Sequence, residues 1–490
     1  MGHMLGKNKD GIQRLFHLLL PSHSRRRASF RRTEPFESCP TLGGLARLVA
    51  FCAPLVAGID ANRTLKDELA AAINRRSTRR RISVTDLVNP RQAYFARTRP
   101  DLKPSPDRQQ SMMAGTGFHE FFGRAISTEE FVEQLVEFQE IVGKIDIYEA
   151  IPLELKTTAS IPTNIIGSRP GHAEQLGMYC AMVNTSAQSV ATGHLLYYKR
   201  AEWGRPPELR AFDVEFSDLA GIVGEMIRRR DLLREALDTL DPARLPRCEW
   251  FGRNCTYGEI CGCAGADPLQ RIVTGSTVRV RENPEFAERV RNSLAPMAPR
   301  EGLAINDLVF PRRAAMRRLA GSAKEEEDAE DRMASLQQRG FQTALQDVIW
   351  YGFPGASRRV KVLFGQIKAS VVQFRGLPMI LRNNKQKKMI ERSRLSEEVP
   401  HYLDRLGFEC ALVESERGRL VIYYSSIPED KFMVYDVWFK DLAGIRSEME
   451  RRVALLEGGA PPDQLPPCRP AWMARFCPFA PGCGCAKEEA

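Results

Sequence analysis

The segment VGKIDIYEAIPLELKTT (142–158) alternates apolar and polar residues along two short stretches. Alternation of this kind is typical of strands, so the pattern predicts a strand pair joined by a turn near 148–150. Because successive side chains of a strand point to opposite faces, Glu154 and Lys156 lie on one face, and the turn brings Asp146 beside them. The pattern therefore predicts that two carboxylates and a lysine converge.

In other stretches the apolar residues recur every three or four positions, as they do in helices. GTGFHEFF (115–122) is expected to begin one helix, and EQLGMYCAMV (174–183) and DVWFKDLAGIRSEMERRVALL (436–456) are expected to lie in two others. The longest apolar run, LGGLARLVAFCAPLVAG (42–58), contains an arginine and a proline and is barely long enough to cross a bilayer. A buried helix is therefore expected there, and no membrane span.

The chain also matches itself over much of its length. ISVTDLVNPRQAYFAR (82–97) corresponds to LAINDLVFPRRAAMRR (303–318) at an offset of 221 residues, from 82 to 303. Further pairs follow in the same order: EQLGMYCAMV with DRLGFECALV, DLAGI with DLAGI, and LPRC with LPPC. Matches in one order over about 200 residues predict two copies of one domain, because the period is too long for a solenoid.

The predicted organisation has four parts. A basic arm with a helix occupies 1–60, the first copy 61–264, a linker 265–281 and the second copy 282–490. Each copy is expected to be α/β, with a mixed central sheet flanked by helices and a C-terminal cysteine segment. The arm is interpreted either as a solvated tail or as a DNA contact.

Composition narrows the class of protein. With 490 residues and 43% hydrophobic residues, the chain has material for more than one packed core. Its formal charge of +10 indicates a polyanionic partner, with nucleic acid first. The first residues lack the pattern of a cleavable signal peptide, so a cytoplasmic location is expected. In that compartment the twelve cysteines are metal ligands or buried apolar residues rather than disulfides.

Each copy ends in four closely spaced cysteines. The spacing is C-x6-C-x5-C-x-C in the first copy and C-x8-C-x5-C-x-C in the second. The residues are Cys248, Cys255, Cys261 and Cys263, and then Cys468, Cys477, Cys483 and Cys485. By count, four thiolates fit an iron-sulfur (4Fe-4S) cluster or a structural zinc ion equally well. The remaining four are expected to be buried apolar residues: Cys39, Cys52, Cys180 and Cys410.

The converging side chains of the 142–158 segment suggest metal chemistry. Carboxylate oxygens are the ligands that Mg²⁺ and Mn²⁺ prefer, and a lysine beside them can orient or help deprotonate an attacking water. A surface hairpin whose Glu154 and Lys156 are merely solvated is the alternative interpretation.

Four features in a fixed order restrict the class of protein more than the hairpin alone. They are a helix with Gly115 and His119, the hairpin with Asp146, Glu154 and Lys156, a Gln-x-x-x-Tyr helix and four cysteines. This series resembles the RecB-like branch of the PD-(D/E)XK nucleases, most closely the CRISPR-associated exonuclease family called Cas-four. The resemblance covers about 200 residues of the first copy. It implies that His119, Asp146 and Glu154 are the metal ligands and Lys156 the catalytic lysine.

The same resemblance assigns contacts to DNA. Gln175 and Tyr179 match the family's Gln-x-x-x-Tyr motif, which lies beside the bound strand. NPRQAYF (89–95) matches its Cys-Pro-Arg segment except that an asparagine replaces the cysteine, and Arg91 and Tyr94 there are expected to contact phosphate and base. A helix start with a buried tyrosine is the alternative. The family context favours an iron-sulfur cluster over zinc.

The resemblance implies a metal-dependent DNA exonuclease. Water activated by the metal attacks a phosphodiester, and the metal and Lys156 stabilise the charge of the transition state. Family members degrade single-stranded DNA from an end, often 5′ to 3′. The cellular task is expected to be CRISPR spacer acquisition or DNA repair, with the proteins of either process as partners. A non-catalytic DNA-binding scaffold with two clusters is the competing hypothesis.

The second copy is expected to be inactive. Gln342 stands at the position of His119, Ile380 at that of Glu154, Arg382 at that of Lys156, and Lys368 is aligned with Asp146. No metal-binding carboxylate survives in this alignment, and Arg405 and Glu409 replace the glutamine and tyrosine of the helix motif. A basic domain that guides DNA is predicted, with a purely structural partner as the alternative. The protein is expected to be a monomer in which the two copies pack as a pseudo-dimer.

Overall fold

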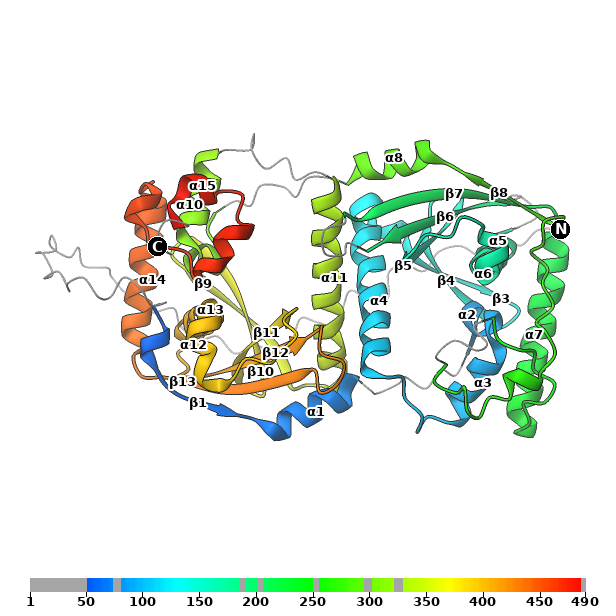
Figure 1. Cartoon of the computed structure of the whole chain (residues 1–490), viewed down its shortest axis with the longest axis horizontal. Coiled ribbons are helices and arrows are strands. Elements are labelled where there is room, and N and C mark those ends of the chain that lie inside the picture. The colour runs from blue at the N-terminus through cyan, green and yellow to red at the C-terminus, as the bar shows by residue number, and fades with distance from the viewer. Residues whose placement is uncertain are drawn as a thin grey trace, which may run out of the picture. The chain divides into compact units, whose positions relative to one another are not determined.

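The computed structural model describes residues 51–73, 81–184, 190–200, 206–249, 255–294, 302–320 and 329–485. Two mixed sheets organise these residues, each covered by helices, which confirms the α/β class (Figure 1). The predicted basic arm and Cys39 lie outside the described residues. Among the helices that are described, none is long and apolar enough to cross a membrane.

The first sheet has the strand order β2-β4-β5-β6-β7-β8, with β3 paired to β4. Its strands are β2 (Ile82–Ser83), β3 (Val132–Phe138), β4 (Ile141–Tyr148), β5 (Pro152–Thr158), β6 (Thr192–Lys199), β7 (Glu208–Phe216) and β8 (Val278–Glu282). The helices of this copy are α2 (Val84–Val88), α3 (Pro90–Thr98), α4 (Pro106–Ile126), α5 (Ile165–Ser168), α6 (Pro170–Val183), α7 (Leu219–Thr239) and α8 (Pro284–Ser293). The strand pair predicted from 142–158 is thus found as β4 and β5.

The second sheet has the order β1-β13-β12-β11-β10-β9, which matches β8-β7-β6-β5-β4-β3 of the first. Its strands are β1 (Val56–Ala61), β9 (Ser357–Phe364), β10 (Ile367–Phe374), β11 (Leu377–Asn384), β12 (Arg417–Tyr424) and β13 (Phe432–Phe439). Its helices are α1 (Arg63–Ile73), α9 (Ile305–Val309), α10 (Pro311–Ala320), α11 (Ala329–Gly352), α12 (Leu395–Glu398), α13 (Pro400–Leu412), α14 (Leu442–Glu457) and α15 (Ala480–Cys483). In both sheets one central pair is parallel, β5 with β6 and β11 with β12.

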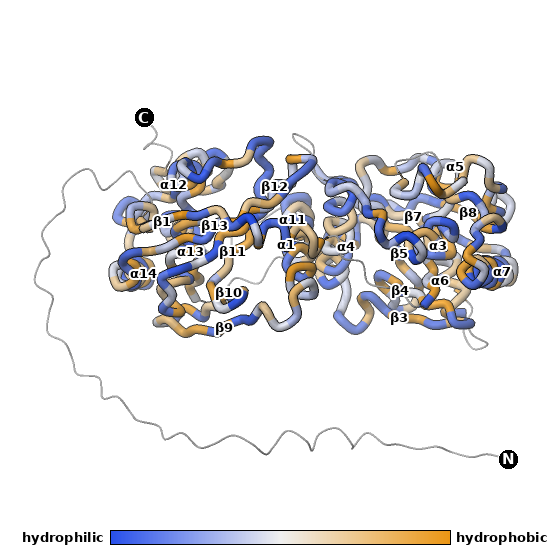
Figure 2. Tube along the Cα trace, turned by 90° about the horizontal axis from the view of Figure 1, so that it is seen from below, coloured by the Kyte–Doolittle hydropathy of each residue, from blue (hydrophilic) through white to orange (hydrophobic). Residues whose placement is uncertain are grey.

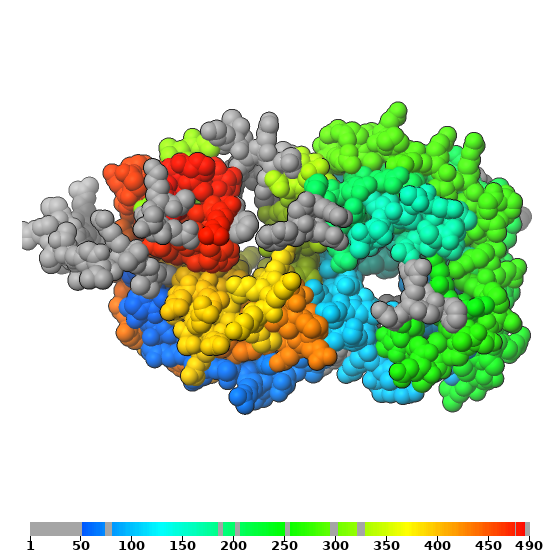
Figure 3. All heavy atoms as spheres, viewed as in Figure 1, coloured from blue at the N-terminus to red at the C-terminus, as the bar shows by residue number. Residues whose placement is uncertain are grey.

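The edge strands of the two sheets are exchanged between the copies. β1 precedes the first copy in sequence but pairs antiparallel with β13 of the second. β8 precedes the second copy but pairs antiparallel with β7 of the first. Figure 3 shows the blue residues of this N-terminal segment against yellow and orange residues of the second copy. Each sheet is therefore completed by a strand that directly precedes the other copy in the sequence.

Two matching asparagines fix these exchanged segments. Asn62 donates to Asp436 on β13 at 2.9 Å and accepts from the backbone N–H of Leu65, at the start of α1. Asn283 donates in the same way to Asp213 on β7, and it caps α8 through the backbone N–H of Phe286. A helix cap and an anchor to the neighbouring strand are thus combined in one side chain.

These segments correct two expectations. Residues 51–58, expected to continue a buried helix, contain a short 3₁₀ turn and the beginning of β1. The segment 265–281, expected to be a linker, ends within β8. Both are short, largely exposed edge strands. β1 (VAGIDA) lacks a clear apolar alternation, whereas β8 (VRVRE) alternates valine with arginine over only four residues.

The two copies are held together where α4 crosses α11, which lie side by side in Figures 1 and 2. Gly117 and Gly340 meet at the crossing. A Cβ atom on Gly117 would lie 2.0 Å from the carbonyl oxygen of Gly340, and one on Gly340 would lie 2.3 Å from that of Gly117. Only glycine permits two backbones to approach this closely.

Candidate functional site

The four side chains expected to carry the chemistry come together at the β4–β5 hairpin and α4. His119 Nδ1 lies 3.3 Å from Asp146 Oδ1. Asp146 Oδ2 accepts from the backbone N–H of Leu155 at 2.8 Å, which holds the carboxylate toward the neighbouring strand. Glu154 and Lys156 lie on the same face of β5, and Lys156 Nζ donates to Glu154 Oε1 at 2.5 Å. The convergence expected from strand alternation is therefore found.

A chain of hydrogen bonds connects this hairpin to α6. Lys156 Nζ also donates to Gln175 Oε1 at 2.9 Å, and Gln175 Nε2 donates to the hydroxyl of Tyr179 at 3.1 Å. Gln175 and Tyr179 are one helical turn apart, so both reach the same face of the sheet. The lysine is thereby held between a carboxylate and an amide oxygen.

Burial sets the electrostatics of the two carboxylates. Glu154 is 3% exposed, and burial raises its pKa to about 7, against the opposing charge of Lys156. Asp146 differs: burial would raise its pKa, but the nearby His119 and Lys156 outweigh this and lower it. The two carboxyl groups of one hairpin thus differ in how readily they ionise.

The residues fit a hard divalent cation by their chemistry. An imidazole nitrogen and two carboxylates are available, and Glu154 Oε2 is buried without a hydrogen-bond partner. A buried, unpartnered carboxylate oxygen is costly unless a cation satisfies it. In the described parts of the chain, no three or more His, Cys, Asp or Glu side chains already lie together as ligands of one metal ion.

Arg91 and Tyr94, expected to contact DNA, are buried instead. Arg91 is 4% exposed and donates to the carbonyl oxygens of Ala243, Leu245 and Cys261. Tyr94 is 5% exposed and packs edge-on against the adjacent phenylalanine ring. The segment is a helix start with a buried tyrosine, and its arginine binds the cysteine-bearing loop. The sequence motif alone does not show that its arginine points toward the cysteine-bearing loop and away from solvent.

The four cysteines of the first copy lie beside one another. Cys248 and Cys261 lie near enough to Cys263 for the three thiols to shift one another's pKa. Cys255 is close enough for its charge to act on Cys248 and Cys261. The interaction with Cys248, together with Cys261 and the charge of Arg91, lowers the pKa of Cys263 to about 5. A thiolate is the form that binds a metal or a cluster.

The second copy repeats this arrangement. The interaction with Cys468 lowers the pKa of Cys485 to about 5, and Cys477 and Cys483 lie nearby. Arg312 takes the place of Arg91 and donates to the carbonyl oxygens of Leu465 and Cys483. Thiols near a buried arginine suit a metal or a cluster by their chemistry, but in the described parts of the chain neither group is assembled as the ligands of one metal ion.

The remaining described cysteines match the expectation of buried apolar residues. Cys52, Cys180 and Cys410 are each 0% exposed. Burial raises the pKa of Cys180 to about 12, so its thiol stays protonated.

Asn89, at the start of α3, also contacts the cysteine segment. Its side-chain oxygen accepts from the backbone N–H of Glu249 at 3.2 Å, directly after Cys248. Together with Arg91, this hydrogen bond ties the start of α3 to the cysteine segment. The connection between the two ends of the domain is thus made by hydrogen bonds.

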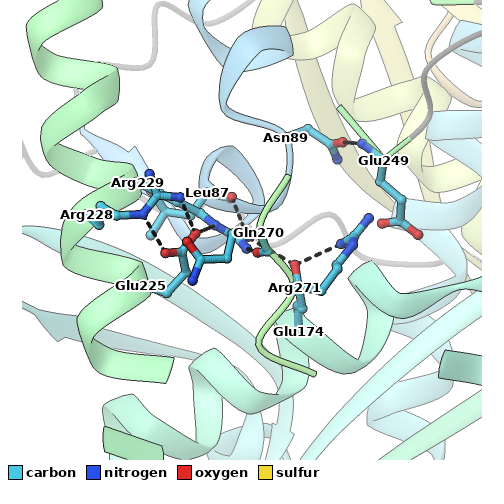
Figure 4. A network of polar contacts seen from close by, with 9 residues as sticks. All are labelled: Leu87, Asn89, Glu174, Glu225, Arg228, Arg229, Glu249, Gln270 and Arg271. Atoms are coloured by element: carbon cyan, nitrogen blue, oxygen red, sulfur yellow. Dashed lines mark hydrogen bonds and ion pairs between the residues drawn. The ribbon is translucent and has the colours of Figure 1, made fainter. Parts of the chain in front are cut away.

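A buried ion network behind the site was not anticipated (Figure 4). Arg229 is fully buried and pairs with Glu174 at 3.0 Å and Glu225 at 2.7 Å. Glu174 precedes Gln175 on α6, so the network fixes the helix that carries the glutamine. In the second copy Arg452 pairs with Glu448 in the same way. The repeated Glu-Met-x-Arg-Arg sequence was the signal that could have found it.

The strand pairing corrects one position of the second copy. The β3–β4 and β9–β10 turns align Ile141 with Ile367, so Val372 corresponds to Asp146. Lys368 is the second residue of β10, next to the β9–β10 turn, and is exposed. The alignment of GKID with GQIK placed the gap wrongly. Valine still supplies no ligand, and Ile380 and Arg382 hold the positions of Glu154 and Lys156 on β11.

Comparisons with known proteins add little. No family model matches the chain, and no curated protein matches it. Among solved structures, the chain is similar to one described as "Crystal structure of SSO0001", with 18% sequence identity and a TM-score of 0.25. That match covers 41% of this chain and 95% of the other. At this TM-score the likeness carries no argument.

Proposed function

We propose that the first copy is a metal-dependent deoxyribonuclease of the PD-(D/E)XK type, which hydrolyses phosphodiester bonds at ends of single-stranded DNA. The observation that carries the proposal is the grouping of His119, Asp146, Glu154 and Lys156 at one hairpin and one helix, with Glu154 Oε2 buried and unpartnered. The net charge of +10 suits a nucleic-acid substrate. The second copy holds DNA without cleaving it.

The roles of the residues follow from their contacts. His119, Asp146 and Glu154 would hold Mg²⁺ or Mn²⁺, which supplies Lewis-acid polarisation of the phosphate and a more acidic water. Lys156 stabilises the negative charge that develops on the phosphate oxygens. Gln175 positions the lysine ammonium through their hydrogen bond, and Tyr179 positions Gln175. The buried Arg229 network keeps α6 in register with the sheet.

The cysteine groups have a structural role in this proposal. Each would hold a 4Fe-4S cluster, with zinc as the alternative ion, and each closes its domain through Arg91 or Arg312. The cellular task proposed for the chain is the processing of DNA ends, in CRISPR spacer acquisition or in repair.

The test is cleavage of end-labelled single-stranded DNA with Mn²⁺ or Mg²⁺ by anaerobically purified protein. Asp146→Ala removes one proposed ligand and is expected to abolish cleavage while DNA affinity is retained. Asp101→Ala, at an exposed carboxylate paired with Arg99, serves as the control and is expected to cleave normally. Absence of cleavage in the parent protein would favour the DNA-binding scaffold.

A further inference from the structure

Two arginines lie where the second copy lacks its metal site. Arg382 is on β11 and Arg405 is on α13 (Figure 1). These elements correspond to β5 and α6 of the first copy, which carry Lys156 and Gln175. We call the two arginines, with the flanking Tyr402 and His401, the double-arginine cluster. The guanidinium of Arg382 lies over the ring of Tyr402, 5.7 Å from its centroid.

The matching lysine of the first copy shows what has been lost. Lys156 is held by two acceptors, Glu154 and Gln175. In the second copy an isoleucine stands at the first position and Arg405 at the second, so both acceptors are gone. Arg382 therefore has a cation where its counterpart has a hydrogen-bond acceptor.

The charges of the cluster do not balance. Arg405 pairs with Glu409 at 2.6 Å, and Glu409 is 4% exposed. Among the described residues, no ion pair joins Arg382 to a carboxylate, and its Nε is buried without a hydrogen-bond partner. One positive charge is left over on a side chain that is only partly exposed, and a charge without a partner there is costly.

The pKa shifts of neighbouring groups are consistent with this excess of positive charge. Burial and the charge of Arg405 lower the pKa of Arg382. Burial and Arg382 lower the pKa of His401 to about 3, so this histidine is neutral, and its Nδ1 is buried without a partner. Two unpartnered nitrogens thus belong to adjacent side chains of one cluster.

The surface beside the cluster is basic as well. The loop after β11 carries three exposed lysines, Lys385, Lys387 and Lys388. Lysines arranged next to a planar guanidinium suit a chain of phosphates better than a single carboxylate ligand.

We propose that the double-arginine cluster binds one phosphate group of a nucleic acid strand, so that an anion site has replaced the cation site of the first copy. The choice of a DNA strand as the source of the phosphate rests on the proposed nuclease function. The anion site itself rests only on the second copy and holds whether or not the first copy cleaves.

Phosphate binding is tested by thermal unfolding and by DNA affinity, in an Asp146→Ala background that leaves the DNA intact. Arg382→Gln removes the unpaired guanidinium, and Arg446→Gln, an arginine on α14 that is about half exposed, changes the net charge equally. The probes are inorganic phosphate and a short single-stranded oligonucleotide with either a 5′-phosphate or a 5′-hydroxyl, at constant ionic strength.

Phosphate is expected to raise the Tm of the parent and of Arg446→Gln but not that of Arg382→Gln. Without phosphate, Arg382→Gln is expected to unfold at the same or a higher temperature, because it removes an uncompensated charge. A purely structural arginine would lower the Tm instead. Oligonucleotide affinity should fall about tenfold in Arg382→Gln, a change of about 1.4 kcal/mol.

The two oligonucleotides separate the sources of the phosphate. A preference for the 5′-phosphate that Arg382→Gln abolishes identifies a strand end, and equal losses for both oligonucleotides identify an internal phosphodiester. Equal thermal shifts in Arg382→Gln and the parent, or unchanged affinity for both oligonucleotides, would overturn the proposal. Neither result depends on cleavage by the first copy.

Discussion

Lys156 and Arg382 occupy matching positions on β5 and β11, and their surroundings decide their chemistry. Lys156 is paired with a buried carboxylate and an amide, so its charge is fixed beside the hairpin. Arg382 lacks both partners. The acceptors Glu154 and Gln175 are replaced by Ile380 and Arg405, so the matching cation of the second copy has neither hydrogen bond.

Replacing the lysine tests its role in the proposed reaction. Lys156→Met keeps the length of the side chain but removes the charge that stabilises the phosphate, so cleavage should fall on the order of 100- to 1,000-fold. Single-turnover cleavage of end-labelled DNA measures the effect. Lys144→Met on β4, an exposed lysine paired with Glu133, is expected to cleave normally. Equal rates in both variants would remove Lys156 from the mechanism.

Replacing Arg91 distinguishes its two interpretations. Arg91→Gln loses buried hydrogen bonds to three carbonyl oxygens, so stability should fall by about 3 kcal/mol and less metal should be bound per chain. Chemical unfolding and metal analysis measure both quantities. Arg99→Gln, at an exposed arginine paired with Asp101, is the control. Weaker DNA binding with unchanged metal content would instead restore Arg91 as a DNA contact.

Local sequence rules predicted the arrangement of the site but not the burial of its flanking residues. Strand alternation placed Asp146, Glu154 and Lys156 together because the period of a strand fixes the face of each side chain. Burial depends on what packs from elsewhere in the chain, and the loop that covers Arg91 comes about 150 residues later, at Leu245 and Cys261. The local sequence pattern therefore could not predict the role of Arg91.

At the scale of elements, the crossing of α4 and α11 connects the copies and carries His119. The histidine lies two residues after Gly117, so the same helix turn that contacts the second copy also contributes to the site of the first. Helix spacing predicted that 115–122 forms a helix. It could not predict the partner helix. The contact at the two glycines is between backbones, so no pattern of apolar side chains in the sequence marks it.

Gly340→Ala tests the crossing. The added Cβ would meet the backbone of Gly117, which cannot move aside without separating the helices, so unfolding should be easier by about 2–3 kcal/mol. Gly224→Ala on α7 has nothing within 4 Å of the new Cβ, and it should be neutral or stabilising by up to about 1 kcal/mol. Urea unfolding of both variants measures the difference. Equal stabilities would show that the two helices do not touch as described.

At the scale of the whole molecule, the sequence repeat and the folded domain are different units. The repeat was inferred from matches in one order along the sequence, and the structure has two mixed sheets of similar strand order. Which sheet receives each terminal strand is decided by pairing between distant segments, β1 with β13 and β8 with β7. Residues 51–73 thus stabilise the second copy, although the first copy follows them directly along the chain.

Removing residues 1–73 is therefore expected to damage the second copy more than the first. Without β1 and α1, the edge of β13 is uncovered, and Leu65 and Leu69 no longer fill the core beside Tyr423. Amide hydrogen exchange should rise in β13 and β12 while β4 and β5 stay protected. Removing only 1–50 leaves both exchanged strands in place and serves as the control. Faster exchange confined to β4 and β5 would mean that the N-terminal segment belongs to the first copy, and the reciprocal exchange of edge strands would be wrong.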